Sequence, residues 1–169
     1  VQDAGSSHSS SNNSLNGVSI GDIVTFGAYE QDNDLTNGKE PIEWIVLEKN
    51  SNKIMLISKY GLDCQLYCED GADITWETSM LRQWLNNTFY NSAFSSAEQS
   101  SIITSYVDNS NSQCCTEKSW NNYGASDTND KVYVLSYRES ITYFDTPESR
   151  TCLPTQYAIA QGTETKEAA

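Results

Sequence analysis

The chain contains a single histidine, which limits the chemistry that its side chains can perform. His8 lies in a serine-rich stretch, residues 5–11, where nothing holds an imidazole in place. A Ser–His or Cys–His catalytic pair needs an imidazole within hydrogen-bond distance of the nucleophile, and a histidine-rich zinc or iron site needs several imidazoles. The sequence therefore argues against histidine-based catalysis and against histidine metal sites.

The five cysteines are an odd number, so at least one thiol stays unpaired within the chain if the others form disulfides. Cys64 and Cys68 lack the second cysteine pair that a zinc knuckle requires. The adjacent Cys114 and Cys115 cannot easily close a disulfide on each other. Cys64, Cys68 and Cys152 are the candidates for disulfide bonding in an oxidising compartment, and free thiols are the alternative.

Asp32 and Asp34 alternate with other oxygen-bearing side chains ahead of a glycine, as in a calcium-binding loop. The closing bidentate glutamate of an EF-hand is absent at the required spacing, so a solvated hairpin loop is the default interpretation. Asp127, Asn129 and Asp130 form a second pattern of the same kind. The sequence therefore predicts no metal and no cofactor, with calcium at Asp32 and Asp34 as the alternative.

Two carboxylates could hydrolyse a glycosidic bond if they flanked it at a suitable separation. No spacing among the 23 acidic residues singles out such a pair. Asp63 and Glu77 are one example of two acids that a hydrolase could use. Carboxyl groups much more than roughly 10 Å apart can perform neither retaining nor inverting hydrolysis. A carboxylate-dependent, carbohydrate-active hydrolase is therefore kept as the alternative function.

Aromatic and amide side chains gather in the polar segment 108–130, which has no core periodicity. Trp120 and Tyr123 flank Asn121 and Asn122, a mixture of apolar faces and hydrogen-bonding groups that suits a carbohydrate or protein surface. A loop of this length inside a domain is typically functional or disordered. We expect these four residues to contact a ligand; the alternative is that Trp120 folds back onto its own domain.

The charge and composition favour an exported recognition domain. The formal net charge is −13, which argues against binding to nucleic acid or to an anionic membrane surface. The Ser/Asn-rich residues 1–17 read as a flexible tether that follows a removed signal or anchor. We expect one domain over 18–162 and a tail over 163–169. An extracellular glycan or protein is the expected partner, and the charge favours a cationic or neutral one.

Hydrophobic periodicity predicts an α+β fold, in which a small antiparallel sheet with a central hairpin carries short helices. Capping boxes at Ser95 and Ser136 mark two helix starts. The predicted strands are 22–27, 42–47, 53–58, 102–107 and 131–136, and the predicted helices are 77–90, 95–102, 136–144, a turn after Pro147, and 155–161. The predicted core includes Phe26, Trp44, Val46, Leu56, Leu81, Trp84 and Leu85.

Several motifs resemble an uncharacterised domain family of bacterial, often gut-associated, surface proteins. The matching segments are GDIVTFGAYEQ (21–31), EPIEWIVL (40–47), LISKYGLD (56–63), WETSMLRQWLN (76–86), FYNSAF (89–94) and CLPTQYAIAQG (152–162). The resemblance covers roughly residues 20–162 and implies a fold related to C-type lectins and sulfatase-modifying factors, with a small antiparallel core, two helices and elaborate loops.

The resemblance also implies that the domain is incomplete or closes differently here. Family members usually continue past the segment at 157–162 into a Trp-Leu-Arg-Ser stretch and a terminal Arg-Pro-Ala-Leu strand, whereas this sequence continues as Thr163 to Ala169. The family offers no catalytic residue to carry over. Together with the missing histidine chemistry, this favours a secreted or surface-anchored, non-enzymatic recognition domain over an enzyme.

Overall fold

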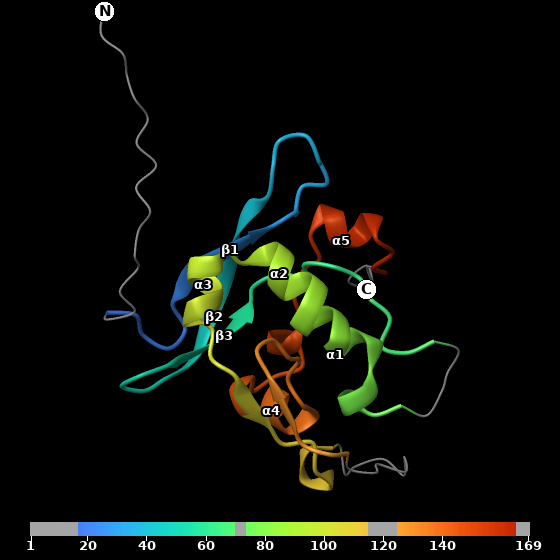
Figure 1. Cartoon of the computed structure of the whole chain (residues 1–169). Coiled ribbons are helices and arrows are strands. Elements are labelled where there is room, and N and C mark those ends of the chain that lie inside the picture. The colour runs from blue at the N-terminus through green and yellow to red at the C-terminus, as the bar shows by residue number, and fades with distance from the viewer. Residues whose placement is uncertain (1–16, 70–73, 115–124, 165–169) are drawn as a thin grey trace, which may run out of the picture.

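The fold combines two small antiparallel sheets with a series of short helices (Figure 1). A computed structural model describes residues 17–69, 74–114 and 125–164, so residues 1–16 of the predicted tether lie outside these ranges. The strands are β1 (Ile23–Tyr29), β2 (Glu40–Lys49), β3 (Ile54–Ser58), β4 (Ser105–Val107) and β5 (Thr128–Asp130). The α+β class expected from the sequence is confirmed.

Strand β2 is the centre of the three-stranded sheet, with β1 on one side and β3 on the other. Ile45 of β2 pairs with Ile23 of β1 and with Ile57 of β3, antiparallel in both cases. The predicted β2–β3 hairpin therefore forms, but the prediction that it is central is wrong for β3, which lies at the sheet edge. The segment 131–136, which could have paired beyond β3, does not form a strand.

A β-bulge at Gly27 brings β1 against the helices. The pairing of β1 with β2 shifts by one residue between Thr25 and Ala28, and Gly27 adopts a φ of 72°. A Cβ atom at this position would lie 2.6 Å from the ring of Phe94. The N–H of Gly27, freed from the ladder by the bulge, donates to Glu98 Oε1 at 2.9 Å. Only glycine satisfies both the backbone conformation and the close packing.

A series of helical turns, here called the helical rod, follows the first sheet (Figure 1). Its parts are the 3₁₀ turn η1 (Trp76–Thr78), α1 (Met80–Trp84), the π-helical turn η2 (Leu85–Phe89) and α2 (Tyr90–Ala93). Ser79 caps α1, because its hydroxyl accepts the N–H of Arg82 at 3.1 Å. A helix forms where one was predicted over 77–90, but it starts at Met80, after the separate turn η1, and continues to Ala93.

Both predicted capping boxes are present. In α3 (Ser96–Ser101) the box joins Ser95 and Glu98, and in α4 (Tyr137–Tyr143) it joins Ser136 and Glu139. Each glutamate accepts the backbone N–H of its serine at 2.8 Å. The two reciprocal hydrogen bonds satisfy N–H groups that have no partner inside the helix, and they explain why these starts are readable from sequence.

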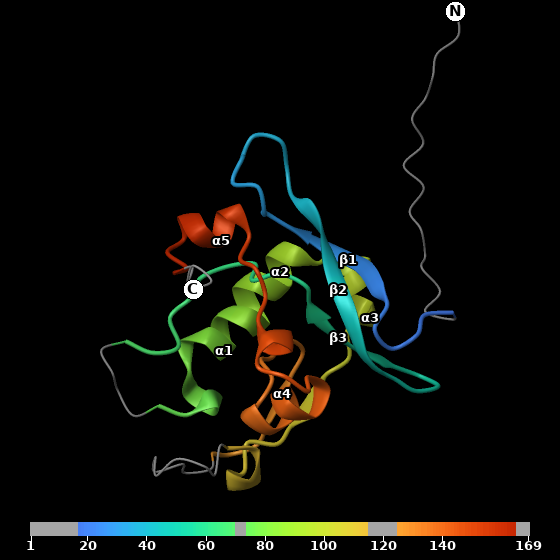
Figure 2. The same ribbon diagram turned by 180° about the vertical axis from the view of Figure 1, so that it is seen from behind.

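The C-terminal part of the described chain contains the predicted helical turn η4 (Glu148–Arg150) and helix α5 (Gln156–Ala160). Helix α5 lies beside the base of the loop between β1 and β2 in both views (Figures 1 and 2). The N–H of Tyr157 donates to the carbonyl of Gln31 at 3.0 Å and fixes this contact. Across the described ranges, no helix has the length and apolar character needed to span a membrane.

The buried core agrees with the predicted one in part, because Phe26, Trp44, Trp84 and Leu85 pack against the central buried cluster. Val46 is 1% exposed, as predicted. The other predicted core residues are half-buried: Phe26, Trp44, Leu56, Leu81, Trp84 and Leu85. The central buried cluster consists of Tyr29, Ile42, Leu62, Phe89, Tyr90, Ala93 and Phe94. Periodicity identified side chains that face inward, but the space that they face is partly open.

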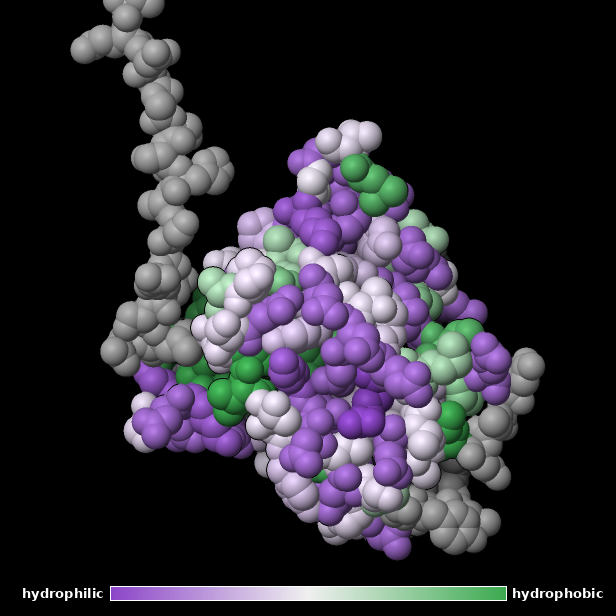
Figure 3. Space-filling view, viewed as in Figure 1, coloured by the Kyte–Doolittle hydropathy of each residue, from purple (hydrophilic) through white to green (hydrophobic). Residues whose placement is uncertain are grey.

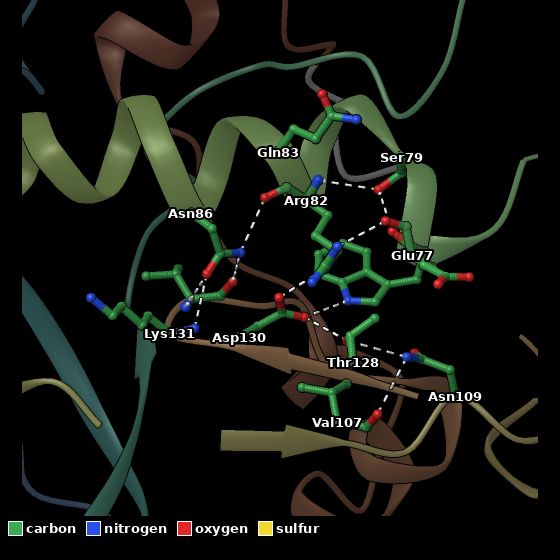
Figure 4. A network of polar contacts seen from close by, with 12 residues as sticks. Glu77, Ser79, Arg82, Gln83, Asn86, Val107, Asn109, Thr128, Asp130 and Lys131 are labelled. Carbon is green, nitrogen blue, oxygen red and sulfur yellow. Dashed lines mark hydrogen bonds and ion pairs between the residues drawn. The ribbon is translucent and has the colours of Figure 1, made fainter. Parts of the chain in front are cut away.

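The strand predicted over 131–136 is absent because a helix side chain takes the hydrogen bonds of its first residues. Asn86 Oδ1 accepts the N–H of Lys131 at 2.8 Å and that of Val132 at 3.3 Å. Asn86 Nδ2 donates to the carbonyl of Val132 at 2.9 Å. Figure 4 shows Asn86 pointing from the helical rod toward this segment. The asparagine replaces a strand partner, which periodicity alone does not reveal.

The second sheet differs from the prediction at both strands. The strand predicted over 102–107 is shorter, because only residues 105–107 form β4. The segment 108–130, predicted as a loop, ends in β5, whose Thr128 pairs with Val107. Strand β5 has the sequence Thr-Asn-Asp, which carries no hydrophobic alternation, so its pairing was not predictable from the pattern.

A buried carboxylate joins the second sheet to the helical rod (Figure 4). Asp130 is 2% exposed and accepts Arg82 Nε at 2.8 Å, Trp76 Nε1 at 3.0 Å and the Thr128 hydroxyl at 2.6 Å. A buried carboxylate needs such partners because an unpaired charge in the interior is strongly unfavourable. The network explains why Trp76 is buried.

We predict that Gly27→Ala destabilises the protein by at least about 2 kcal/mol, because it forces an unfavourable φ and inserts a methyl group into a packed contact. Gly38→Ala is the matched control: Gly38 also has a positive φ, of 98°, but no atom lies within 4 Å of its added Cβ. Urea unfolding of both variants measures the difference. Equal losses would show that the contact with Phe94 contributes nothing.

We predict that Asp130→Asn lowers the free energy of unfolding by about 3–5 kcal/mol, because an amide NH₂ must face at least one of the donors and no negative charge remains beside the Arg82 guanidinium. The control is Glu43→Gln, which breaks the Lys59–Glu43 ion pair, where both side chains are about one-third exposed. That variant should unfold almost as the parent does. Thermal and urea unfolding test both; a silent Asp130→Asn contradicts the role of the network.

Candidate functional site

An apolar groove of about 1500 Å³ lies between the three-stranded sheet, the helical rod and the segments around α4. Figure 3 shows apolar side chains in a hollow between α3 and the β2–β3 hairpin, on a face that is otherwise largely hydrophilic. Residues of α3 and of this hairpin line the groove. Its volume exceeds the roughly 300–1,000 Å³ of typical small-molecule pockets.

The half-buried residues from the predicted core form two walls of this groove. The sheet contributes Phe26, Trp44 and Leu56, and the helical rod contributes Trp84, Leu81 and Leu85. The indole N–H of Trp44 donates to the carbonyl of Phe26 at 2.7 Å, which fixes the ring of Trp44. Trp84 packs on the buried Phe89, with ring centroids 5.4 Å apart. The walls are therefore aromatic and held in place.

The outer edge of β3 borders the groove and leaves backbone groups unpaired. Lys59 N donates to Glu43 O across the β2–β3 ladder. In an antiparallel ladder, residues that bond to the partner strand alternate with residues that do not. Lys59 and Ile57 therefore face β2, while the N–H and C=O groups of Leu56 and Ser58 point away from it. No described residue forms a hydrogen bond with these outward groups.

A second segment, without regular secondary structure, lines the same groove. Residues 132–135 contribute Val132, Tyr133, Val134 and Leu135 to its wall. Beyond Val132, which Asn86 holds, the backbone groups of 133–135 form no hydrogen bond within the described ranges. The groove thus has two boundaries that carry free backbone donors and acceptors, with apolar side chains between them.

Two phenols and a carboxylate occupy the end of the groove near the β2–β3 hairpin. The Tyr143 hydroxyl donates to Glu48 Oε1 and lies 3.6 Å from Met55 Sδ. Burial, together with this carboxylate, raises the pKa of Tyr143 above its usual range. Burial also raises the pKa of Tyr133, with Glu139 and Glu48 adding to the effect. Both phenols therefore stay protonated and act as hydrogen-bond donors, not as bases.

The carboxylates considered for hydrolysis are not brought together by any contact. The Asp63 carboxylate accepts the Tyr29 hydroxyl at 2.5 Å and the N–H of Cys64 at 2.6 Å. Glu77 is exposed in the turn η1, and its backbone carbonyl accepts Arg82 Nη1. No hydrogen bond or ion pair joins these two described residues, so nothing in the geometry favours the hydrolase alternative.

The loop between β1 and β2 contains the carboxylates considered for calcium. Asp34 Oδ1 accepts the N–H and hydroxyl of Thr36 within the loop. Asp32 instead lies beside Glu30 and Glu40, and one oxygen from each of these three residues falls within 4.8 Å of the others. Sequence reasoning missed Glu30 and Glu40, because their proximity comes from the strand pairing and not from their spacing.

The cysteine and aromatic predictions are not tested by the structure. Cys64, Cys68 and Cys152 are free thiols in the described chain, together with Cys114, and their disulfide pairing stays a prediction. The four predicted ligand-contact residues, Trp120, Asn121, Asn122 and Tyr123, lie outside the described residues.

The sequence matches a family described as "Domain of unknown function (DUF6273)" over residues 51–168. The motifs at 21–31 and 40–47 lie before this match. No curated protein and no solved structure matches the chain. Because the match covers well over half of the sequence, the protein belongs to the DUF6273 family, as the resemblance to an uncharacterised domain family predicted.

Proposed function

We propose that this protein is a non-enzymatic recognition domain that binds an extended segment of polypeptide in the apolar groove. One observation carries the proposal. The outer edge of β3 and residues 133–135 border the same groove, and their backbone N–H and C=O groups have no hydrogen-bond partner among the described residues. An added strand supplies the alternating N–H and C=O groups that such an edge lacks, as in β-augmentation.

The chemistry of the walls defines the ligand. Phe26, Trp44 and Trp84 offer aromatic surface, which accommodates the apolar side chains on one face of a strand. The groove is larger than a small-molecule pocket, as an oligomeric ligand requires. The net charge of −13 favours a segment with cationic residues at its ends. The proposed ligand is therefore an extended peptide with alternating apolar side chains and positive net charge.

The proposal includes a location for the domain. A Ser/Asn-rich sequence over 1–17 suits a tether that holds a recognition domain away from a cell surface. The motif resemblance supports a distant relation to C-type lectins and sulfatase-modifying factors. We place the domain outside the cell or on its surface, where a protein partner would present the extended segment.

The experiment compares two substitutions at Ser58, whose N–H points into the groove. Ser58→Pro removes that N–H without removing a bond to β2, and proline is tolerated where an edge strand faces away from its partner. Ser58→Ala is the matched control, because it keeps the N–H. Linear peptides selected on the parent protein from a random twelve-residue display library serve as labelled probes in fluorescence polarisation.

We expect the selected peptides to alternate apolar residues and to bind Ser58→Ala as they bind the parent. Ser58→Pro should weaken binding at least about tenfold, or roughly 1.4 kcal/mol, while its melting temperature stays close to that of Ser58→Ala. Enrichment of no peptide, or equal affinity for both variants, would refute binding at the β3 edge.

A further inference from the structure

Three carboxylates from different positions meet at the base of the β1–β2 loop. Glu30 directly follows β1, and Glu40 begins β2, where it pairs with Tyr29. Asp32 is the third residue after β1. One carboxylate oxygen of each residue lies within 4.8 Å of the other two, so the antiparallel pairing itself brings three negative charges together.

Glu30 has an oxygen that no group of the described chain satisfies. The residue is 7% exposed, and Oε1 is buried without a hydrogen-bond partner. A buried carboxylate oxygen without a donor is unfavourable because it loses its hydration. A cation beside Oε1 would supply the partner that this oxygen lacks within the described chain.

No cation of the described residues neutralises this cluster. Lys39, adjacent to Glu40 in sequence, instead donates its Nζ to the backbone carbonyl of Ser92. The ion pairs in the described ranges are Lys59–Glu43 and Arg82–Asp130. In a chain with a formal charge of −13, an uncompensated group of three carboxylates attracts an external cation.

Hydrogen bonds hold the other two carboxylates in place. Glu40 Oε2 accepts the N–H of Gln31 at 2.7 Å. The Asp32 oxygens accept the N–H of Asp34 and the side-chain amide of Asn37, each at 2.8 Å. The oxygens are thus positioned before any ligand arrives.

We propose that Glu30, Asp32 and Glu40 bind a calcium ion at the base of the β1–β2 loop. Ca²⁺ takes six to eight oxygen ligands in flexible geometry, and waters can complete the shell around these carboxylates. Mg²⁺ requires near-ideal octahedral geometry and releases its waters reluctantly, which an irregular loop serves poorly. The ion would connect the end of β1 with the start of β2. It would act on α5 through Gln31, whose carbonyl accepts the N–H of Tyr157.

The test measures the melting temperature of the purified chain against CaCl₂ or MgCl₂, from a baseline in EGTA. Glu40→Gln removes a ligand charge while keeping an acceptor for Gln31. Asp145→Asn removes the same charge from an exposed residue that forms no hydrogen bond or ion pair with the cluster, and it serves as the matched control. Asp34→Asn tests the ligand pair suggested by sequence. Calorimetric titration of CaCl₂ gives the affinity directly.

We expect a saturable rise of about 3–6 °C when Ca²⁺ is tenfold above its Kd, with a Kd of about 10⁻⁴–10⁻³ M. Asp145→Asn and Asp34→Asn should keep the response, and Glu40→Gln should lose it. No response of the parent to Ca²⁺ would overturn the calcium proposal. A response that survives Glu40→Gln but is lost in Asp34→Asn would overturn the proposed ligand set.

Discussion

The packing of the first sheet on the helices depends on the absence of a side chain at Gly27. Its positive φ creates the bulge in β1, and its missing Cβ leaves room for the ring of Phe94. The bulge frees one N–H, which Glu98 accepts while the same carboxylate caps α3. One glutamate therefore fixes the start of a helix and the irregularity of a strand, so that α2, α3 and β1 hold one another in a single arrangement.

The helical rod contacts the two sheets at separate places, and the groove lies between these two contacts. Asp130 anchors the second sheet to the start of the rod through Arg82, and Asn86 anchors the segment after it one turn later. The first sheet attaches at the other end, around Phe94. Between these attachments no described strand connects β3 with residues 133–135. The aromatic walls consequently face an open space instead of a closed core.

Local signals in the sequence predicted local structure well, because the interactions involved span a few residues. The capping boxes at Ser95 and Ser136 need only a partner three residues away, and the periodicity of Leu81, Trp84 and Leu85 marks one helix face. Residues 131–136 have the pattern of a strand, yet Asn86, 45 residues earlier, takes the first hydrogen bonds. The same periodicity that placed Trp84 and Leu56 in the core could not show that the space between their two elements is partly open.

Three carboxylates in this fold show how environment decides what an acidic residue does. Asp130 is buried against a guanidinium and neutral donors. For Glu98, burial pushes the pKa up, but the hydrogen bonds from Ser95 and Gly27 outweigh it and lower the pKa. Glu30 is as deeply buried as the core, but Oε1 has neither a cation nor a donor in the described chain. The first two carboxylates have hydrogen-bond partners within the fold, whereas Glu30 Oε1 has none among the described residues. That difference, and not the number of acidic residues nearby, is the physical reason to look for a bound cation at the base of the β1–β2 loop.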